Sequence, residues 1–197
     1  MEFASLLRPL GVAAGPAAVL ALALLVGGLV TAGDDVETSP FATASAAFLL
    51  VALLGIGAAA VTALARLRVG GRGGTGVGIA VVGTVLVAGG AWAALFVLPA
   101  LAEKAPNLLE TGLPSVVVGY IASYTVFTVG WVWTGVSLIR ARLVPTWLGV
   151  LVSVGGALAF VPAPEAFRLL LIGVAASLLA RRLAVPLPAA ALSEVAA

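Results

Sequence analysis

The chain has 197 residues, of which 62% are hydrophobic and 9% are charged, and its formal net charge is +2. Because a soluble domain carries about 25% charged residues, water cannot be the solvent for most of this chain. The composition excludes a disordered polymer and, with no cysteine, a disulfide-stapled scaffold, and the small net charge argues against nucleic-acid binding. It therefore predicts an all-α, multi-pass integral membrane protein.

Six apolar runs follow one another along the chain. They lie at residues 10–32, 41–65, 75–101, 113–139, 143–161 and 166–181. The first four can cross a hydrocarbon core about 30 Å thick, whereas the uncharged part of the sixth, 169–180, measures only about 18 Å as a helix. We predict one domain of six transmembrane helices over 1–182 and a flexible cytoplasmic tail over 183–197. The alternative is that the last two helices form a re-entrant hairpin.

The loops alternate in charge along the chain. One set carries eight arginines and two glutamates, and the other carries six acidic residues with Lys104 and Arg168. Since basic loops stay in the cytoplasm, six crossings place both termini there. The abundance of Ala, Gly, Val and Arg favours a bacterial cytoplasmic (inner) membrane. We expect the arginines of the inner loops and tail to contact lipid headgroups: Arg66, Arg68, Arg72, Arg140, Arg142, Arg181 and Arg182.

The run at 113–139 is the most polar of the six. A helix turns by 100° per residue, which places one set of its polar and aromatic side chains on a single face. This face either lines a cavity for a lipid, a quinone or another apolar small molecule, or forms a buried packing seam. Its candidate ligand-binding residues are Tyr120, Tyr124, Phe127, Trp131 and Thr134.

Arg168 is the one charged residue that the pattern places close to the membrane core. Charged residues inside a membrane are candidate functional residues. Glu165 lies three positions earlier, which is the spacing of an ion pair on one helical face. We predict a structural Glu165–Arg168 pair or a headgroup contact, and the alternative is a contact between Arg168 and an anionic substrate.

Two loops contain patterns that are similar to functional motifs. Residues 71–76 match G-x-G-x-x-G, but they join two membrane helices, whereas a dinucleotide site needs a preceding strand. Asp34, Asp35 and Glu37 could attract a cation, although a solvated loop that caps the second helix explains them better. The sequence has no histidine and no cysteine, which excludes imidazole and thiolate metal sites and nucleophilic triads that use them. We predict no metal, no cofactor and no catalytic residue.

A resemblance covers about forty residues that begin at Ser123. A polar-aromatic helix leads to a short basic turn with Arg140 and Arg142, and Pro145 then starts the next helix. That helix continues with Leu148-Gly149 and Gly155-Gly156. This arrangement resembles small bacterial multi-pass membrane proteins that are catalogued as a domain of unknown function. The resemblance implies a membrane fold and no particular activity.

The residue inventory favours a non-catalytic role as an accessory or scaffold subunit of a membrane complex. The alternative is a transporter, or a membrane protein that binds a lipid or a small apolar ligand on the face of 113–139. The expected partners are the bilayer and other membrane subunits or a second copy. Gly11 and Gly15 favour close helix packing, either within the bundle or in a homodimer. A filled, dry face on 113–139 would favour the scaffold, and an open cavity would favour the ligand-binding protein.

Overall fold

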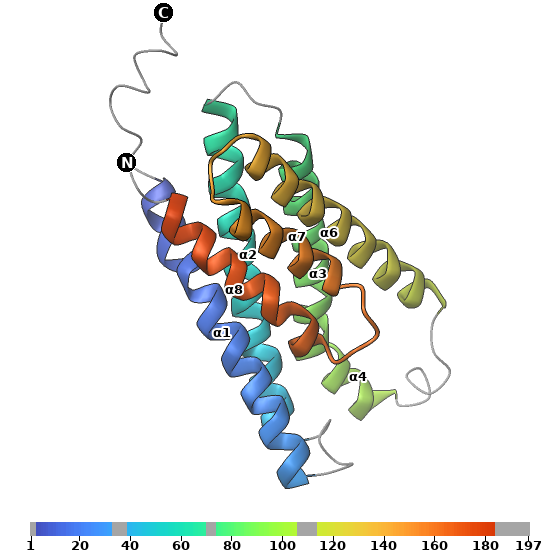
Figure 1. Ribbon diagram of the computed structural model, residues 1–197. Coiled ribbons are helices and arrows are strands. Elements are labelled where there is room, and N and C mark those ends of the chain that lie inside the picture. The colour runs from blue at the N-terminus through green and yellow to red at the C-terminus, as the bar shows by residue number, and fades with distance from the viewer. Residues whose placement is uncertain (1–2, 33–38, 70–73, 106–113, 184–197) are drawn as a thin grey trace, which may run out of the picture.

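The computed structural model describes residues 3–32, 39–69, 74–105 and 114–183 (Figure 1). These ranges form helices joined by short turns and contain no strand, so the prediction of an all-α chain is confirmed. The helices are α1 (Phe3–Ala32), α2 (Pro40–Val69), α3 (Thr75–Phe96), α4 (Leu98–Lys104), α6 (Pro114–Arg140), α7 (Thr146–Leu158) and α8 (Glu165–Leu183).

Four of these helices are long and apolar enough to cross a membrane: Leu7–Ala32, Pro40–Arg68, Thr75–Phe96 and Pro114–Arg140. α7 is apolar but has only 13 residues, or about 20 Å. α8 has 19 residues and carries charged residues near both ends. The described part of the chain thus has four candidate spans, where the sequence predicts six.

The sequence predicts one helix over 75–101, and the structure divides it at Val97. The C-terminal piece, α4, has Pro99 in its first turn. Proline has no backbone N–H, so Pro99 cannot donate the hydrogen bond that a continuous helix needs at that position. The N–H of Val97 still donates to Ala93 O at 2.8 Å, so the hydrogen bonding of α3 continues as far as this residue.

The six longer helices form a closed ring in the order α1, α2, α3, α6, α7, α8, and α8 packs against both α1 and α2 (Figure 1). Each helix runs antiparallel to the next. The Ser45 hydroxyl of α2 donates to Ala21 O of α1 at 2.7 Å. The Ser177 hydroxyl of α8 donates to Val12 O at 2.8 Å, which closes the ring. The start of α1 and the end of α8 therefore lie at the same end of the bundle.

Glycines allow the closest helix contacts. A methyl group on Gly83 of α3 would collide with the backbone of Phe127, and one on Gly130 of α6 would collide with the backbone of Ala80. These reciprocal glycines let the two backbones touch. Gly11 and Gly15 of α1 face α8 in the same way, against Ala180 and Ser177. The predicted small-residue pair thus packs within the bundle.

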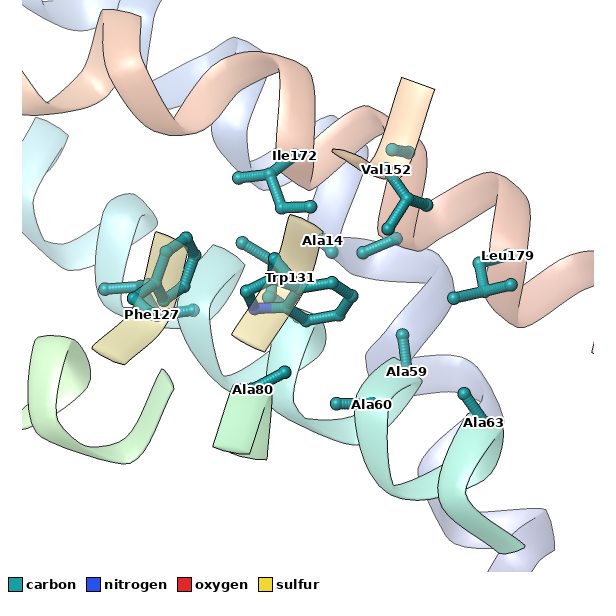
Figure 2. Packing of buried hydrophobic residues seen from close by; sticks show 14 of the residues in the cluster. Ala14, Ala59, Ala60, Ala63, Ala80, Phe127, Trp131, Val152, Ile172 and Leu179 are labelled. Atoms are coloured by element: carbon teal, nitrogen blue, oxygen red, sulfur yellow. The ribbon is translucent and has the colours of Figure 1, made fainter. Parts of the chain in front are cut away.

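The interior and the outer surface are both apolar. Figure 2 shows the indole of Trp131 in the middle of the buried cluster, with Ala80 on one side and Val152 and Ile172 on the other. On the outside, Val30 is 81% exposed and Val85 65%. An apolar exterior of this extent is suited to lipid, because water would penalise it. The fold is compatible with a multi-pass membrane protein.

The turn between α6 and α7 is closed by backbone hydrogen bonds. Leu143 N–H donates to Leu138 O at 3.2 Å and Arg142 N–H donates to Ile139 O at 2.9 Å. This is a Schellman arrangement, and Arg142 occupies its left-handed position with φ 53°. Pro145 caps α7 just before its first residue. The short turn keeps α6 and α7 adjacent.

Candidate functional site

The aromatic face of α6 is continuous in the structure. The ring centroids of Tyr120 and Tyr124 are 4.6 Å apart, those of Tyr124 and Phe127 are 6.4 Å apart, and those of Phe127 and Trp131 are 6.2 Å apart. The two ends of this ladder differ in environment. Phe127 and Trp131 are fully buried, Tyr124 is 3% exposed and Tyr120 is 47% exposed.

The inner half of the ladder is a filled, dry seam. The indole N–H of Trp131 donates to Thr84 Oγ1 of α3 at 3.0 Å, and the Thr84 hydroxyl donates to Ala80 O at 2.7 Å. Thr134 is also fully buried, and its hydroxyl donates a hydrogen bond to Gly130 O. Every polar atom here has a partner inside the bundle. Phe127, Trp131 and Thr134 therefore hold helices together, and they do not line the groove described below.

At the other end of the ladder, Arg168 of α8 is buried, with 7% of its surface exposed. Its Nη1 donates to Ala159 O at 3.0 Å, and its Nη2 donates to the Tyr120 hydroxyl. The guanidinium carbon lies 4.4 Å from the Tyr124 ring centroid and 5.5 Å from that of Tyr120, within cation–π range. The Nε atom is buried without a partner. The side chain thus turns into the bundle and is not extended toward headgroups.

Glu165 lies in the first turn of α8 and contacts one of these tyrosines, Tyr124. The Tyr124 hydroxyl donates to its Oε1. The sequence predicts a direct Glu165–Arg168 pair, but in the structure the two charges are joined through Tyr124. The Glu165 carboxylate accepts a hydrogen bond from the Tyr124 hydroxyl, and the Arg168 guanidinium lies over the face of the Tyr124 ring. The reason is that Tyr124, which α6 supplies, presents its hydroxyl to the carboxylate and its ring to the guanidinium.

A groove with a volume of about 370 Å³ opens beside this cluster, between α3 and α6. Its walls are almost entirely apolar, and its polar end is formed by Tyr120, Tyr124 and Glu165. The apolar walls include Leu86, Val87, Gly90, Ala93, Ala94, Leu98, Val116 and Gly119. Because α3 ends at Val97, Leu98 at the start of α4 forms part of the wall. The volume lies in the range of small-molecule sites.

Two glycines line this groove without being needed for helix packing. A methyl group added to Gly90 or to Gly119 would meet no atom within 4 Å. This differs from Gly83, seven residues before Gly90 on α3, where the backbone of α6 leaves no space. Gly90 and Gly119 keep the groove wide where larger side chains would narrow it.

The structure thus divides the five candidate ligand-binding residues. Tyr120 and Tyr124 line the groove, and the other three belong to the seam. Sequence reasoning missed the contribution of α3 and α4, because nothing in those apolar stretches marks the side that faces α6. It also assigned Glu165 only to a pair, although its carboxylate lines the groove.

Six of the seven predicted headgroup arginines lie in the described ranges, and these six lie at one end of the ring, because α2, α6 and α8 all end there. Arg68, Arg140, Arg142, Arg181 and Arg182 are exposed. Arg66 donates to Leu183 O at 2.7 Å and ties the end of α8 to α2. Arg72, the glycines at 71 and 73, and the acidic residues Asp34, Asp35 and Glu37 lie outside the described residues. Within the described ranges, no three acidic side chains form a group that could hold a metal ion.

Comparison with known proteins gives no match to a family model, to a curated protein or to a solved structure. The resemblance of the segment after Ser123 to small membrane proteins of unknown function therefore stays a prediction. Any functional conclusion depends on the geometry of this chain alone.

Proposed function

We propose that this protein is a membrane protein that binds a lipid-like small molecule in the groove between α3 and α6. The observation that carries the proposal is an open, apolar groove of about 370 Å³ that ends on two tyrosines and a carboxylate. Ligand sites combine apolar walls with a few polar groups that orient the ligand. Gly90 and Gly119 support the proposal, because packing does not require them to be small.

The role we propose is binding or transport, without catalysis. The polar side chains at the groove are one carboxylate, two phenols and the Ser123 hydroxyl, and each already takes part in a hydrogen bond. Exposed apolar residues beside the groove, such as Val116 and Leu98, are 62% and 45% exposed and would face lipid. A ligand would therefore enter from the bilayer.

We further propose that all six helices of the ring cross the membrane, with both termini in the cytoplasm of a bacterial cell. The antiparallel ring supports this topology, because each helix returns to the end where the previous one began. It gathers the arginines of α2, α6 and α8 at one end, as the positive-inside rule requires. α7 can cross if its flanking turns lie within the interfacial regions.

The accessory-subunit role stays the second proposal. It is favoured by the dry, filled seam around Trp131, which is a feature of a packed structural bundle. The open groove at the other end of the same face is what places ligand binding first.

The test is native mass spectrometry of the protein purified in mild detergent, with two matched variants. Gly90→Leu puts a side chain into the groove, and Gly89→Leu puts the same side chain one residue away, at a position that does not line it. Both sites have open space, so both variants should fold. We expect a bound lipid-like molecule in the wild type and in Gly89→Leu, and its loss in Gly90→Leu.

Two outcomes would contradict the proposal. One is a wild-type protein that carries no small molecule in any preparation. The other is a bound molecule that Gly90→Leu leaves in place, because it would then occupy another site. A stoichiometric protein partner together with an empty groove would instead support the accessory-subunit role.

A further inference from the structure

We infer that the polar end of the α3–α6 groove selects an uncharged amphiphile with a hydroxyl head, drawn from the bilayer, over cationic or anionic ones. This inference rests on the proposed function and specifies its ligand class. It is based on which hydrogen-bonding atoms the cluster of Tyr120, Tyr124, Glu165 and Arg168 leaves open to the groove, and on the charge of that cluster.

The two terminal nitrogens of Arg168 are already engaged by the protein, and its Nε, which has no partner, is buried. Both terminal nitrogens donate, one to Ala159 O and one to the Tyr120 hydroxyl, and the group lies within cation–π range of both tyrosine rings. Arg168 is buried and does not line the groove. Arg168 therefore compensates the negative charge of Glu165 without lining the groove, and it offers no direct contact to an anionic head.

Besides the Ser123 hydroxyl, whose hydrogen is donated to Gly119 O, two polar groups that line the groove remain available to a ligand. The Glu165 carboxylate accepts from Tyr124 through Oε1, which leaves Oε2 as an acceptor. The Tyr120 hydroxyl accepts from Arg168, which leaves its own hydrogen to donate. A head that both donates and accepts would satisfy both groups, and an alcohol hydroxyl does so with a single atom.

The charge balance then disfavours ionic heads. Glu165 and Arg168 both contact Tyr124, one at its hydroxyl and the other at its ring, and their formal charges cancel. In a groove surrounded by lipid, an additional charge without a counter-ion is costly. An anionic head would also lie next to the carboxylate. A cationic head would find the ring faces of both tyrosines already shared with a guanidinium.

The experiment uses three photoreactive probes in proteoliposomes that contain the full-length protein. They share one alkyl chain with a diazirine and end in a hydroxyl, a sulfonate or a primary ammonium. The ammonium donates hydrogen bonds as the hydroxyl does but cannot accept one, so it differs in charge and in acceptor capacity. Cross-linked peptides are identified by mass spectrometry. We expect the hydroxyl probe to label α3 and α6 at the groove at least about tenfold more than either ionic probe.

The variant Glu165→Gln tests whether the charge of the cluster determines which probe is preferred. The variant removes the negative charge and leaves the guanidinium of Arg168 uncompensated, so labelling should shift from the hydroxyl probe toward the sulfonate probe. Glu103→Gln is the matched control, since Glu103 is an exposed acid on α4 that does not line the groove. It should leave the order of the three probes unchanged.

The outcomes separate this inference from the proposed function. Equal labelling by all three probes, abolished by Gly90→Leu, would overturn the selectivity and leave the binding site in place. Preferred labelling by an ionic probe in the wild type, or an unchanged preference in Glu165→Gln, would do the same. Labelling that never falls on the groove peptides would overturn both.

Discussion

Trp131 shows that residues on one face of a helix can have very different surroundings. Its indole fills the space between α3, α6, α7 and α8, and its N–H is satisfied by Thr84 alone. About two turns earlier on α6, Tyr124 has a similar aromatic body but lies beside a groove and two charges. The difference lies in the neighbouring helices, because the two residues occupy the same face.

Thr84→Val tests the hydrogen bond that Trp131 makes in the seam. Valine keeps the shape of threonine but leaves the indole N–H without a partner in a dry interior. We expect the free energy of unfolding to fall by about 1–2 kcal/mol. Equilibrium unfolding in mixed detergent micelles measures this change.

The control for this prediction is a double-mutant cycle. In a Trp131→Phe background there is no N–H to leave unpaired, so the same Thr84→Val change should cost only a few tenths of a kcal/mol. An equal loss of stability in both backgrounds would mean that the hydrogen bond contributes nothing.

At the scale of elements, the crossing of α3 and α6 determines the shape of the groove. Gly83 and Gly130 bring the two backbones into contact at the seam. Beyond that contact, the small residues Gly90 and Gly119 leave open space. The seam and the groove are thus consecutive parts of one helix pair, one closed and the other open.

Gly83→Ala tests the closed part of this pair. The added methyl group has no space against the backbone of Phe127, so the helices must separate, and overpacking of this kind costs about 1–3 kcal/mol. Gly89→Ala on the same helix gains the same helix propensity and meets no atom within 4 Å. Thermal unfolding should place Gly83→Ala below the wild type and Gly89→Ala at or above it. If both variants unfolded at the same temperature, the close contact would be refuted.

At the scale of the whole molecule, the ring of six alternating helices places the described acids at the end opposite the arginines of α2, α6 and α8. The arginines of α2, α6 and α8 lie at one end, and Glu103, Lys104 and Glu165 lie at the other. α7 is the shortest of these six helices, so its length gives the weakest support for a full crossing of the membrane. The turn after it therefore distinguishes a full crossing from a re-entrant hairpin.

Single cysteines test this topology, because the chain has none of its own. Pro162→Cys lies in the turn after α7, Lys104→Cys at the end of α4, and Arg140→Cys at the end of α6, and all three positions are exposed. A membrane-impermeant maleimide added to intact cells should label positions 104 and 162, and position 140 only after the membrane is permeabilised. An unlabelled position 162 would indicate a re-entrant hairpin, and a labelled position 140 in intact cells would reverse the orientation.

Much of the architecture was accessible from the sequence. Apolar runs between charged loops predict membrane helices, because hydropathy and length along one chain are enough to identify them. The break at Val97 has a visible cause in Pro99, although the apolar run continues past it. The aromatic face of α6 followed from the 100° turn per residue alone, since that geometry belongs to a single helix.

Only the tertiary structure decided which part of that face is open and what lies against it. Gly83 and Gly90 are both glycines of α3, yet Gly83 contacts the backbone of α6 and Gly90 lines the groove. Arg168 has the spacing of an ion pair with Glu165, yet it stacks on tyrosines from another helix. A sequence determines which way a side chain leaves its own helix. What the side chain meets depends on where the neighbouring helices cross, and that is a property of the whole bundle.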